Sequence, residues 1–307
     1  MAVNVGQLIT EAEYTTLRSG INLVMGTPTG TGTGAAGYNQ TTTAPAISPG
    51  DKITAAAWNA LKTDVDKAYT HQVGSAPDPA LATVNTDSGI TKTIHDALET
   101  VVNFIKDSGN RFALGTGQST TVSASSKTKT GWNGIQIHDV DFTWASAADV
   151  KAFFNAGGKL VFVSSLSYTG TEQKTIDWRT MVSTVGTVTQ DYVNVTRSGT
   201  DGTITSDGYY DLTTTARNIL ERVGTTPYSE NRYKIEARTI TNGVRIRMIY
   251  EDNDAGDQVL GPKLPGPGID ENVQGTLTSA MSYIRPTGTN VQVAAPTVAI
   301  NTATNTF

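Results

Sequence analysis

The stretch YKIEARTITNGVRIRMIY, residues 233–250, decides the fold of the larger part of this chain. Apolar and polar residues alternate along both arms, which is the period of a β-strand with one buried face. Asn242 and Gly243 stand between the arms and both tolerate positive φ, so the pattern predicts a hairpin closed by a type I′ turn. A solvated outer face accounts for Arg245 and Arg247 without any chemistry.

Working outward, the sequence around this hairpin also favours strands. Ile135–Phe142, Lys159–Tyr168 and Gly186–Val195 are expected to be extended. Two short helices interrupt them: one begins after Ser146 and ends at Gly157 and Gly158, and the other spans 175–185 and ends at Gly186. We therefore expect a mainly antiparallel β domain with short helices over residues 135–307, including an extended C-terminal tail.

The N-terminal third has helical periodicity instead. One helix is expected within the first 25 residues, ending at Gly26, and a second over 54–72, where Trp58, Leu61, Val65 and Ala68 share one face and the pair Asp64 and Lys67 lies on the polar side. A third helix is expected to begin at Thr91 or Thr93 and to end at Gly109. Each apolar stripe is narrow, so these helices must pack against neighbours or other subunits.

Two polar, small-residue segments separate these elements. The first, 27–50, is rich in Gly, Thr and Pro and is expected to be an arm that becomes ordered only when a partner holds it. The second gives a linker at 111–134. The predicted fold class is thus α+β: a helical attachment or oligomerisation region at 1–110 with the arm 27–50, the linker, and the β-rich domain 135–307.

Composition excludes several functions. The chain has 307 residues, a net charge of −5 and no cysteine. A deficit of basic residues disfavours nucleic acid as a partner, and the lack of cysteine excludes thiol catalysis, disulfides and thiolate metal sites. The sequence contains no run of about 18 apolar residues, so no membrane span is predicted, and no secretory signal is expected either.

Histidines and acidic residues give only weak site candidates. His138 stands beside Asp139 and Asp141 in IHDVDF, but on a strand His138 faces away from the two carboxylates, so a solvated strand face is favoured over a catalytic or metal site. His71 and His95 are expected to be ordinary helix-surface residues. No catalytic, cofactor-binding or metal-ligating residue is assigned.

Three further motifs resemble binding sites in part. Asp252, Asp254 and Asp257 resemble part of a calcium loop, but the spacing of an EF-hand is absent and a plain acidic turn is favoured. GTGTG at 30–34 lacks the Gly-Lys-Ser/Thr of a phosphate loop. Trp132, Trp144 and Trp178 could form a sugar-binding platform, although a place in the core is the favoured interpretation.

Several segments together resemble a known class of protein. They are DVKAFFNAGGKLVFVSS (149–165), DWRTMVSTVGTV (177–188), YYDL (209–212), the hairpin with its flanks (228–254) and GTLTSAMSYIRPTGTNVQV (275–293), preceded by SPGDKITAAAWNALKTDVDKAYTHQ (48–72). In this order they resemble structural proteins of tailed-bacteriophage particles, of the tail-fibre, neck or baseplate-associated type found in marine contractile-tailed phages. The resemblance covers about residues 130–295.

This resemblance implies a non-enzymatic virion component, made in the host cytoplasm and built into the tail, collar, fibre or baseplate. It implies a homo-oligomer, a trimer or hexamer, that also contacts other virion proteins, with no nucleic-acid partner and no membrane insertion. The alternative is a phage-tail adhesin module that binds a host surface glycan. A carboxylate-based polysaccharide hydrolase ranks last, since the strand pattern of a β-solenoid is absent.

Overall fold

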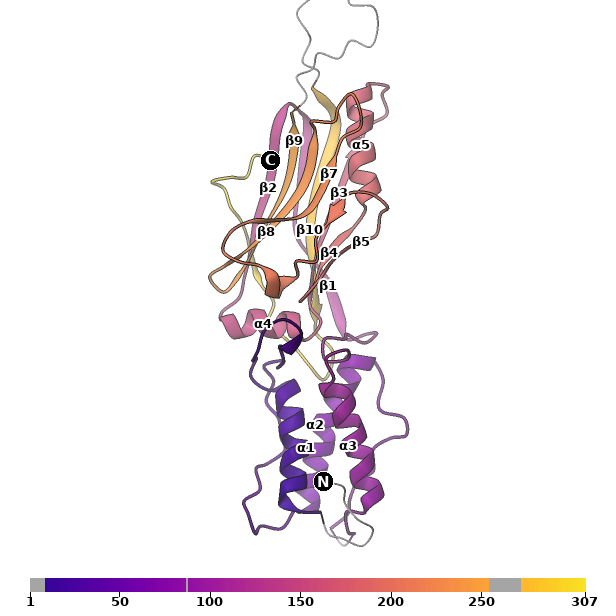
Figure 1. Cartoon of the computed structure of the whole chain (residues 1–307), viewed down its shortest axis with the longest axis vertical. Coiled ribbons are helices and arrows are strands. Elements are labelled where there is room, and N and C mark those ends of the chain that lie inside the picture. Colours follow the sequence, from indigo (N-terminus) through magenta and orange to yellow (C-terminus); the bar gives the residue numbers. More distant parts are fainter. Residues whose placement is uncertain (1–8, 87, 254–271) are drawn as a thin grey trace, which may run out of the picture. The chain divides into compact units, whose positions relative to one another are not determined.

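The computed structural model describes residues 9–86, 88–253 and 272–307, and the chain divides into two compact units (Figure 1). We call them the helical unit and the β unit. The helical unit consists of Met1–Thr120, Ala148–Gly158 and Arg285–Ala295; the β unit consists of Thr121–Ala147, Lys159–Ile284 and Pro296–Phe307. The fold class is α+β, as predicted. The expected division at 110 and 135 is wrong, because two later segments return to the helical unit.

Three helices form the body of the helical unit. They are α1 (Glu11–Met25), α2 (Ala55–Val73) and α3 (Lys92–Lys106), accompanied by the short η1 (Gly32–Gly34) and by α4 (Ala147–Asn155). A threonine caps each long helix: the hydroxyls of Thr10, Thr54 and Thr91 accept a bond from the amide three residues later. The predicted ending of the first helix at Gly26 is confirmed, whereas α3 ends at Lys106, before Gly109.

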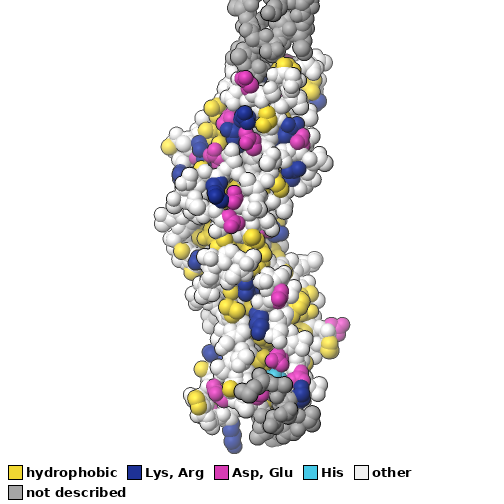
Figure 2. Space-filling view, in the orientation of Figure 1, with side chains coloured by type: hydrophobic (Ala, Val, Ile, Leu, Met, Phe, Trp, Pro, Cys, Tyr) yellow, Lys and Arg dark blue, Asp and Glu magenta, His cyan; other side chains and the backbone are white. Residues whose placement is uncertain are grey.

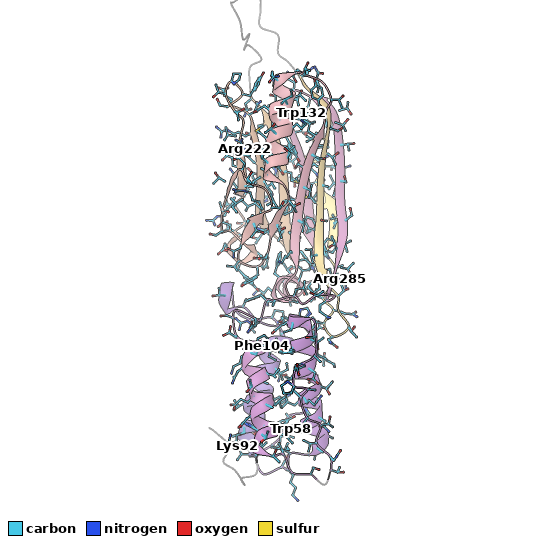
Figure 3. The ribbon with its side chains drawn as sticks, turned by 90° about the vertical axis from the view of Figure 1, so that its right-hand side faces the viewer. Trp58, Lys92, Phe104, Trp132, Arg222 and Arg285 are labelled. Carbon is cyan, nitrogen blue, oxygen red and sulfur yellow. The ribbon has the colours of Figure 1, made fainter. Side chains whose placement is uncertain are left out.

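The three long helices run parallel. The Tyr14 hydroxyl, near the start of α1, donates to the Ala57 carbonyl near the start of α2 at 3.4 Å. Trp58 and His95 pair in the first turns of α2 and α3, with ring centroids 6.4 Å apart, while Tyr69 and Phe104 pair near the other end at 5.2 Å. Figure 3 shows Trp58 and Phe104 at these two levels of the helical unit. Parallel neighbours need long connections, which here are 26–54 and 74–91.

Polar side chains of α2 hold both connections in place. Asp64 is buried and accepts bonds from the amides of Thr43 at 2.6 Å and Ala44 at 2.8 Å, while Asn59 exchanges two bonds with the backbone of Val84. The predicted place of Asp64 on the polar side is therefore wrong. The expectation for 27–50 also fails, since this segment is held by its own chain and buries Tyr38.

Replacing Asp64 by asparagine should lower the free energy of unfolding of the helical unit by about 1.5–3 kcal/mol, the usual contribution of hydrogen bonds to a charged group. Both backbone bonds fall on one carboxylate oxygen and the Thr43 hydroxyl donates to the other; asparagine can offer an oxygen at only one of these positions and lacks the negative charge that strengthens the bonds. Urea unfolding followed by the fluorescence of Trp58, in a chain whose other three tryptophans are phenylalanine, would measure the change. Asp66→Asn is the control: Asp66 pairs with Lys62 at a partly exposed position of the same helix, where about 0.5 kcal/mol is expected. Equal effects of the two substitutions would contradict the prediction.

The β unit contains two antiparallel sheets. The five-stranded sheet has the order β1 (Ser119–Trp132), β10 (Val273–Pro286), β3 (Lys159–Ser167), β4 (Val188–Gln190), β5 (Val195–Arg197). The six-stranded sheet has the order β11 (Thr297–Ile300), β2 (Gly134–Thr143), β9 (Gly243–Asp252), β8 (Arg232–Ile240), β7 (Arg217–Val223), β6 (Thr203–Ile204). Helix α5 (Gln173–Val185) contacts β3 and β7, and η2 (Tyr209–Asp211) precedes β7.

The predicted linker 111–134 contains one of the longest strands of the β unit. Strand β1 has 14 residues, of which only Trp132 is buried. Because β1 lies at the end of its sheet and most of its side chains are serine or threonine, it has no apolar alternation to reveal it. The predicted strand 186–195 is also corrected, because it forms part of two short strands, β4 and β5.

The predicted hairpin is confirmed as β8 and β9, but its turn differs from the prediction. Asn242 has a φ of +51°, whereas Gly243 lies in β9, pairs with Ile240 and has no positive φ. A type I′ turn needs positive φ at both central residues, so that expectation is wrong. The glycine is required for another reason: a Cβ at Gly243 would lie 2.2 Å from the carbonyl oxygen of Phe142 on the neighbouring strand β2.

Hydrogen bonds join the inner faces of the two sheets. Tyr233 and Tyr250 stack across the hairpin with ring centroids 5.1 Å apart, and both hydroxyls bond to Ser164 Oγ of β3, at 2.9 and 2.6 Å. Burial raises the pKa of Tyr250 to about 12, so its hydroxyl stays protonated at neutral pH. The hairpin thus fixes the six-stranded sheet onto the five-stranded one.

Candidate functional site

His138 lies in the interior of the β unit. Its Nε2 is 2.8 Å from Ser125 Oγ of β1 and its Nδ1 is 3.0 Å from Ser279 Oγ of β10, so the ring joins the two sheets. Burial and, to a smaller extent, the charge of Lys127 together lower the pKa of His138 to about 4, which keeps the imidazole neutral. A histidine with no exposed surface and both nitrogens occupied by hydroxyls serves packing, since no substrate reaches it.

Asp139 and Asp141 face away from His138, as the alternation predicts. Arg245 binds Asp141 through two bonds, of 2.5 and 2.7 Å, and Arg247 lies 3.4 Å from Asp139 and 3.0 Å from Glu236. Acidic and basic side chains are interleaved over the visible face of the β unit in Figure 2. The prediction of a solvated strand face holds for Asp141 but not for Asp139, because residues of the C-terminal tail cover Asp139.

Asp252 forms an ion pair inside the β unit. Its Oδ2 lies 2.9 Å from Lys174 Nζ of α5, and both side chains have no exposed surface. An interior ion pair therefore accounts for the first carboxylate of the calcium-like motif. Asp254 and Asp257 lie outside the described residues.

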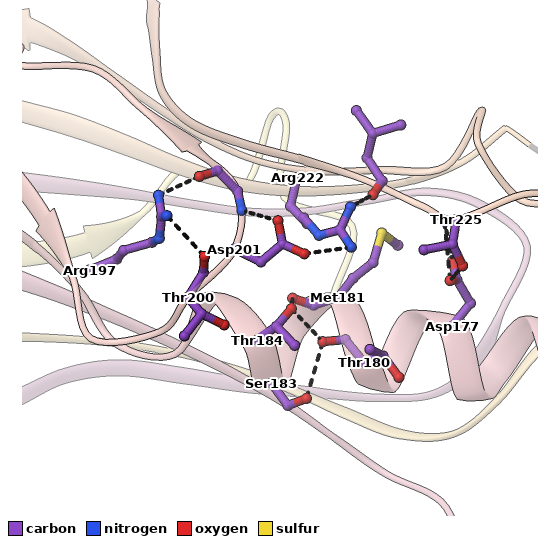
Figure 4. Close-up of polar contacts among 12 residues, drawn as sticks. Asp177, Thr180, Met181, Ser183, Thr184, Arg197, Thr200, Asp201, Arg222 and Thr225 are labelled. Carbon is purple, nitrogen blue, oxygen red and sulfur yellow. Dashed lines mark hydrogen bonds and ion pairs between the residues drawn. The ribbon is translucent and has the colours of Figure 1, made fainter.

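Helix α5 is tied to the neighbouring loops by further polar contacts (Figure 4). Asp177 accepts a bond from the Thr225 amide at 3.1 Å and another from its hydroxyl, and burial raises the pKa of Asp177. The Asp201 amide donates to the Thr184 carbonyl of α5 at 3.2 Å, and the Asp201 carboxylate forms an ion pair with Arg222 of β7 at 2.7 Å. Asp177 has the shifted pKa that active-site acids often show, but its carboxylate anchors a loop.

The tryptophans give no sugar-binding platform. Trp132, Trp144 and Trp178 are each at most 5% exposed, and the rings of Trp132 and Trp178 meet edge to face with centroids 5.5 Å apart. Figure 3 shows the position of Trp132 in the β unit. The favoured place in the core is confirmed, and a glycan site built on these three rings is excluded.

The two helix histidines were expected at the surface, and this expectation is wrong. His71 is fully buried and its Nε2 lies 2.9 Å from the Ala156 carbonyl oxygen, and burial lowers its pKa to about 4. His95 is 2% exposed and its Nδ1 lies 3.3 Å from Asp96 Oδ1. The periodicity of the apolar residues does not predict that either histidine is buried, because both lie just beside the narrow apolar face of their helix.

A pocket of about 580 Å³ lies at the N-terminal end of the three long helices. Its wall combines apolar side chains, including Ile53 and Ile90, with Glu11, Asp51 and Lys52. Because the wall carries both acidic and basic side chains, its charge does not indicate a class of ligand.

Two surfaces of the chain are suited to contact with other chains. One is the outer edge of β1: within the described part of the chain, no backbone hydrogen bond is made on that side of the strand. The other, which we call the apolar patch, consists of Tyr69 and Val73 on α2 and Phe104 on α3; Val73 is 38% exposed and Phe104 36%. Large apolar side chains this exposed are typical of contact sites when they cluster.

No family model, no curated protein and no solved structure matches this chain. In the described residues, no helix combines the length and apolar character that crossing a bilayer requires. The surfaces and buried clusters above are therefore the basis for any statement about function.

Proposed function

We propose that this chain is a non-enzymatic structural subunit of a tailed-bacteriophage particle, a tail, neck or fibre component that assembles with copies of itself and with other virion proteins. The observation that carries the proposal is the open edge of β1. An edge strand presents a row of amide and carbonyl groups to which a further strand can bind. At 14 residues, β1 is long enough to pair with a strand of another chain over most of its length.

The side chains of β1 favour a specific partner over uncontrolled aggregation. Lys127 and Lys129 are its only charged residues, and lysines on an edge discourage pairing with arbitrary strands. Serine and threonine fill most other positions and pair well across strands through their hydroxyls. We infer that the edge binds a strand whose side chains accommodate the two lysines. The first candidate is a strand from another copy of this chain.

The apolar patch supports assembly through a second region. Tyr69, Val73 and Phe104 lie close together on two parallel helices, and burying them against a neighbour would remove apolar surface from water. The interior of the β unit supports a structural role as well. His138, Asp177 and the Lys174–Asp252 pair all have their polar atoms engaged in joining elements of the fold.

Light scattering of the purified chain over a range of micromolar concentrations tests the assembly. We expect a mass three or six times the 32.4 kDa of one chain. Ser126→Lys together with Thr128→Lys adds charge at exposed positions of β1 and should shift the mass toward that of one chain, because a row of lysines along an edge strand discourages pairing with a further strand. The matched control adds lysines at exposed Thr180 and Ser183 of α5 and should leave the mass unchanged.

Two results would contradict the proposal. The first is a single-chain mass at every concentration, and the second is an oligomer that responds equally to both pairs of lysines. Membership of the particle has its own test: mass spectrometry of intact purified phage whose genome encodes this chain should detect it in multiple copies. Absence from such particles would overturn the virion assignment even if the oligomer forms.

A further inference from the structure

One turn of α3 gathers groups that bind metal ions. A donor atom from each of His95, Asp96 and Glu99 lies within 4.8 Å of the donor atoms of the other two. His95 and Glu99 are four residues apart, which places them on the same face of the helix. One imidazole and two carboxylates are the donor types that proteins use for zinc and neighbouring divalent metals.

The imidazole of His95 gives an independent reason to expect a ligand. His95 is 2% exposed, and only its Nδ1 has a hydrogen-bond contact in the described structure, at 3.3 Å from Asp96 Oδ1. The Nε2 has none there, and it is not among the fully buried atoms that lack a partner, so it keeps some exposure to solvent and is accessible to a ligand. The ring lines a small cavity of about 70 Å³ together with Glu13 and Glu99. This space exceeds the roughly 30 Å³ that one water molecule occupies in the liquid.

Glu13 brings a further carboxylate from α1. Its Oε2 accepts bonds from the amide and hydroxyl of Thr10, at 2.8 and 2.9 Å, while no described group bonds to Oε1. The hydrogen bonds from Thr10 lower the pKa of Glu13, so its carboxylate is anionic at neutral pH. The bond from Lys92, followed by that from His95, lowers the pKa of Asp96 as well. The cavity is therefore lined by the anionic carboxylate of Glu13, by the side chain of Glu99 and by the ring of His95, with Asp96 beside that ring.

We propose that His95, Asp96 and Glu99 of α3, joined by Glu13 of α1, bind a divalent transition-metal ion of the zinc class. Such an ion would link the first turns of two parallel helices that otherwise contact each other mainly through apolar side chains. Lys92, which pairs with Asp96, is the competing cation, and the metal would take its place or share the carboxylate with it.

Titration of the full-length, tag-free chain with zinc chloride, followed by calorimetry and by imidazole ¹⁵N NMR, tests the site. The chain has three histidines, so their signals are readily assigned. We expect one zinc ion per chain and a shift confined to His95, with His71 and His138 unchanged. Cobalt(II) should broaden the His95 signals by paramagnetic relaxation.

The variants His95→Gln, Glu99→Gln and Glu13→Gln should each weaken zinc binding about tenfold or more. Even the loss of a residue that only hydrogen-bonds to a metal ligand typically lowers metal affinity about 10–100-fold. Glutamine at position 13 keeps an oxygen that accepts the bonds from Thr10, so the start of α1 is preserved. Asp66→Asn is the matched control: it removes a carboxylate from a lysine pair on α2, equivalent to Lys92–Asp96, and should leave the affinity unchanged.

Two outcomes would overturn the metal site. One is the absence of saturable zinc binding, or of a His95 shift, at a tenfold excess of zinc. The other is an equal loss of affinity in Asp66→Asn and in the site variants, which would indicate a general attraction of cations. Helix content measured by circular dichroism must match the parent chain for each variant, and the zinc affinity of Glu13→Gln decides between site and no site if His95→Gln does not fold.

Discussion

Replacing Lys174 by methionine should lower the free energy of unfolding of the β unit by about 3–5 kcal/mol, the usual cost of removing one member of a buried ion pair. Lys174 and Asp252 are both fully buried and 2.9 Å apart. Methionine fills the space of the lysine stem but leaves the carboxylate without its cation in an interior of low dielectric. Urea unfolding followed by tryptophan fluorescence in a Trp58→Phe background reports on the β unit alone, because the other three tryptophans lie there.

Two further variants make this prediction specific. Lys62→Met breaks the partly exposed pair with Asp66 and should change stability by about 0.5 kcal/mol at most. The double variant Lys174→Met with Asp252→Leu should recover most of the loss, since replacing a whole buried pair by apolar residues is often neutral. A loss below about 1 kcal/mol for Lys174→Met, within the range of surface pairs, would show that the pair does not stabilise the fold.

Acidification from pH 6.5 to pH 4 should destabilise both units through their buried histidines. Burial lowers the pKa of His71, in the helical unit, and of His138, in the β unit, from 6.5 to about 4. Between these values the unfolded chain binds protons that the folded chain does not, so stability is complete above pH 6.5 and falls as the pH decreases. Each histidine should contribute a loss of up to about 3 kcal/mol at pH 4, at 1.36 kcal/mol per pKa unit.

Glutamine variants separate the two contributions. His138→Gln keeps an uncharged partner for Ser125 and Ser279 and should remove this part of the acid sensitivity from the β unit only. His71→Gln should do the same for the helical unit. The measurement is the difference in urea midpoint between each variant and the parent chain at pH 7 and at pH 4.5. A difference that does not vary with pH would mean that the imidazole is charged in the folded state or already neutral in the unfolded one.

Local signals predicted most elements of this fold. Threonine caps and terminal glycines define helix boundaries through bonds between residues a few positions apart, so Thr91 and Gly26 could be placed from the sequence. Alternation over Tyr233–Tyr250 likewise predicted the hairpin. These features depend on neighbours in the chain and not on the rest of the fold.

The errors concern residues whose surroundings come from distant segments. Asp64 has the position of a surface residue on its helix but is covered by Thr43 and Ala44. His95 is buried beside Trp58 of α2, and the neighbour that requires Gly243 is Phe142, about a hundred residues away. The signal that could have pointed to His95 was its spacing of four from Glu99, which is too common on helix surfaces to be decisive alone.

The helical unit is discontinuous in sequence, and this affects how it can form during synthesis on the ribosome. Its last segment, Arg285–Ala295, is made some 175 residues after Thr120. At 5–20 residues per second, the three long helices wait roughly 10–35 s for the rest of their unit. A nascent chain ending near residue 120 would therefore display an unfinished surface, and the unit could be completed only after synthesis has passed Ala295.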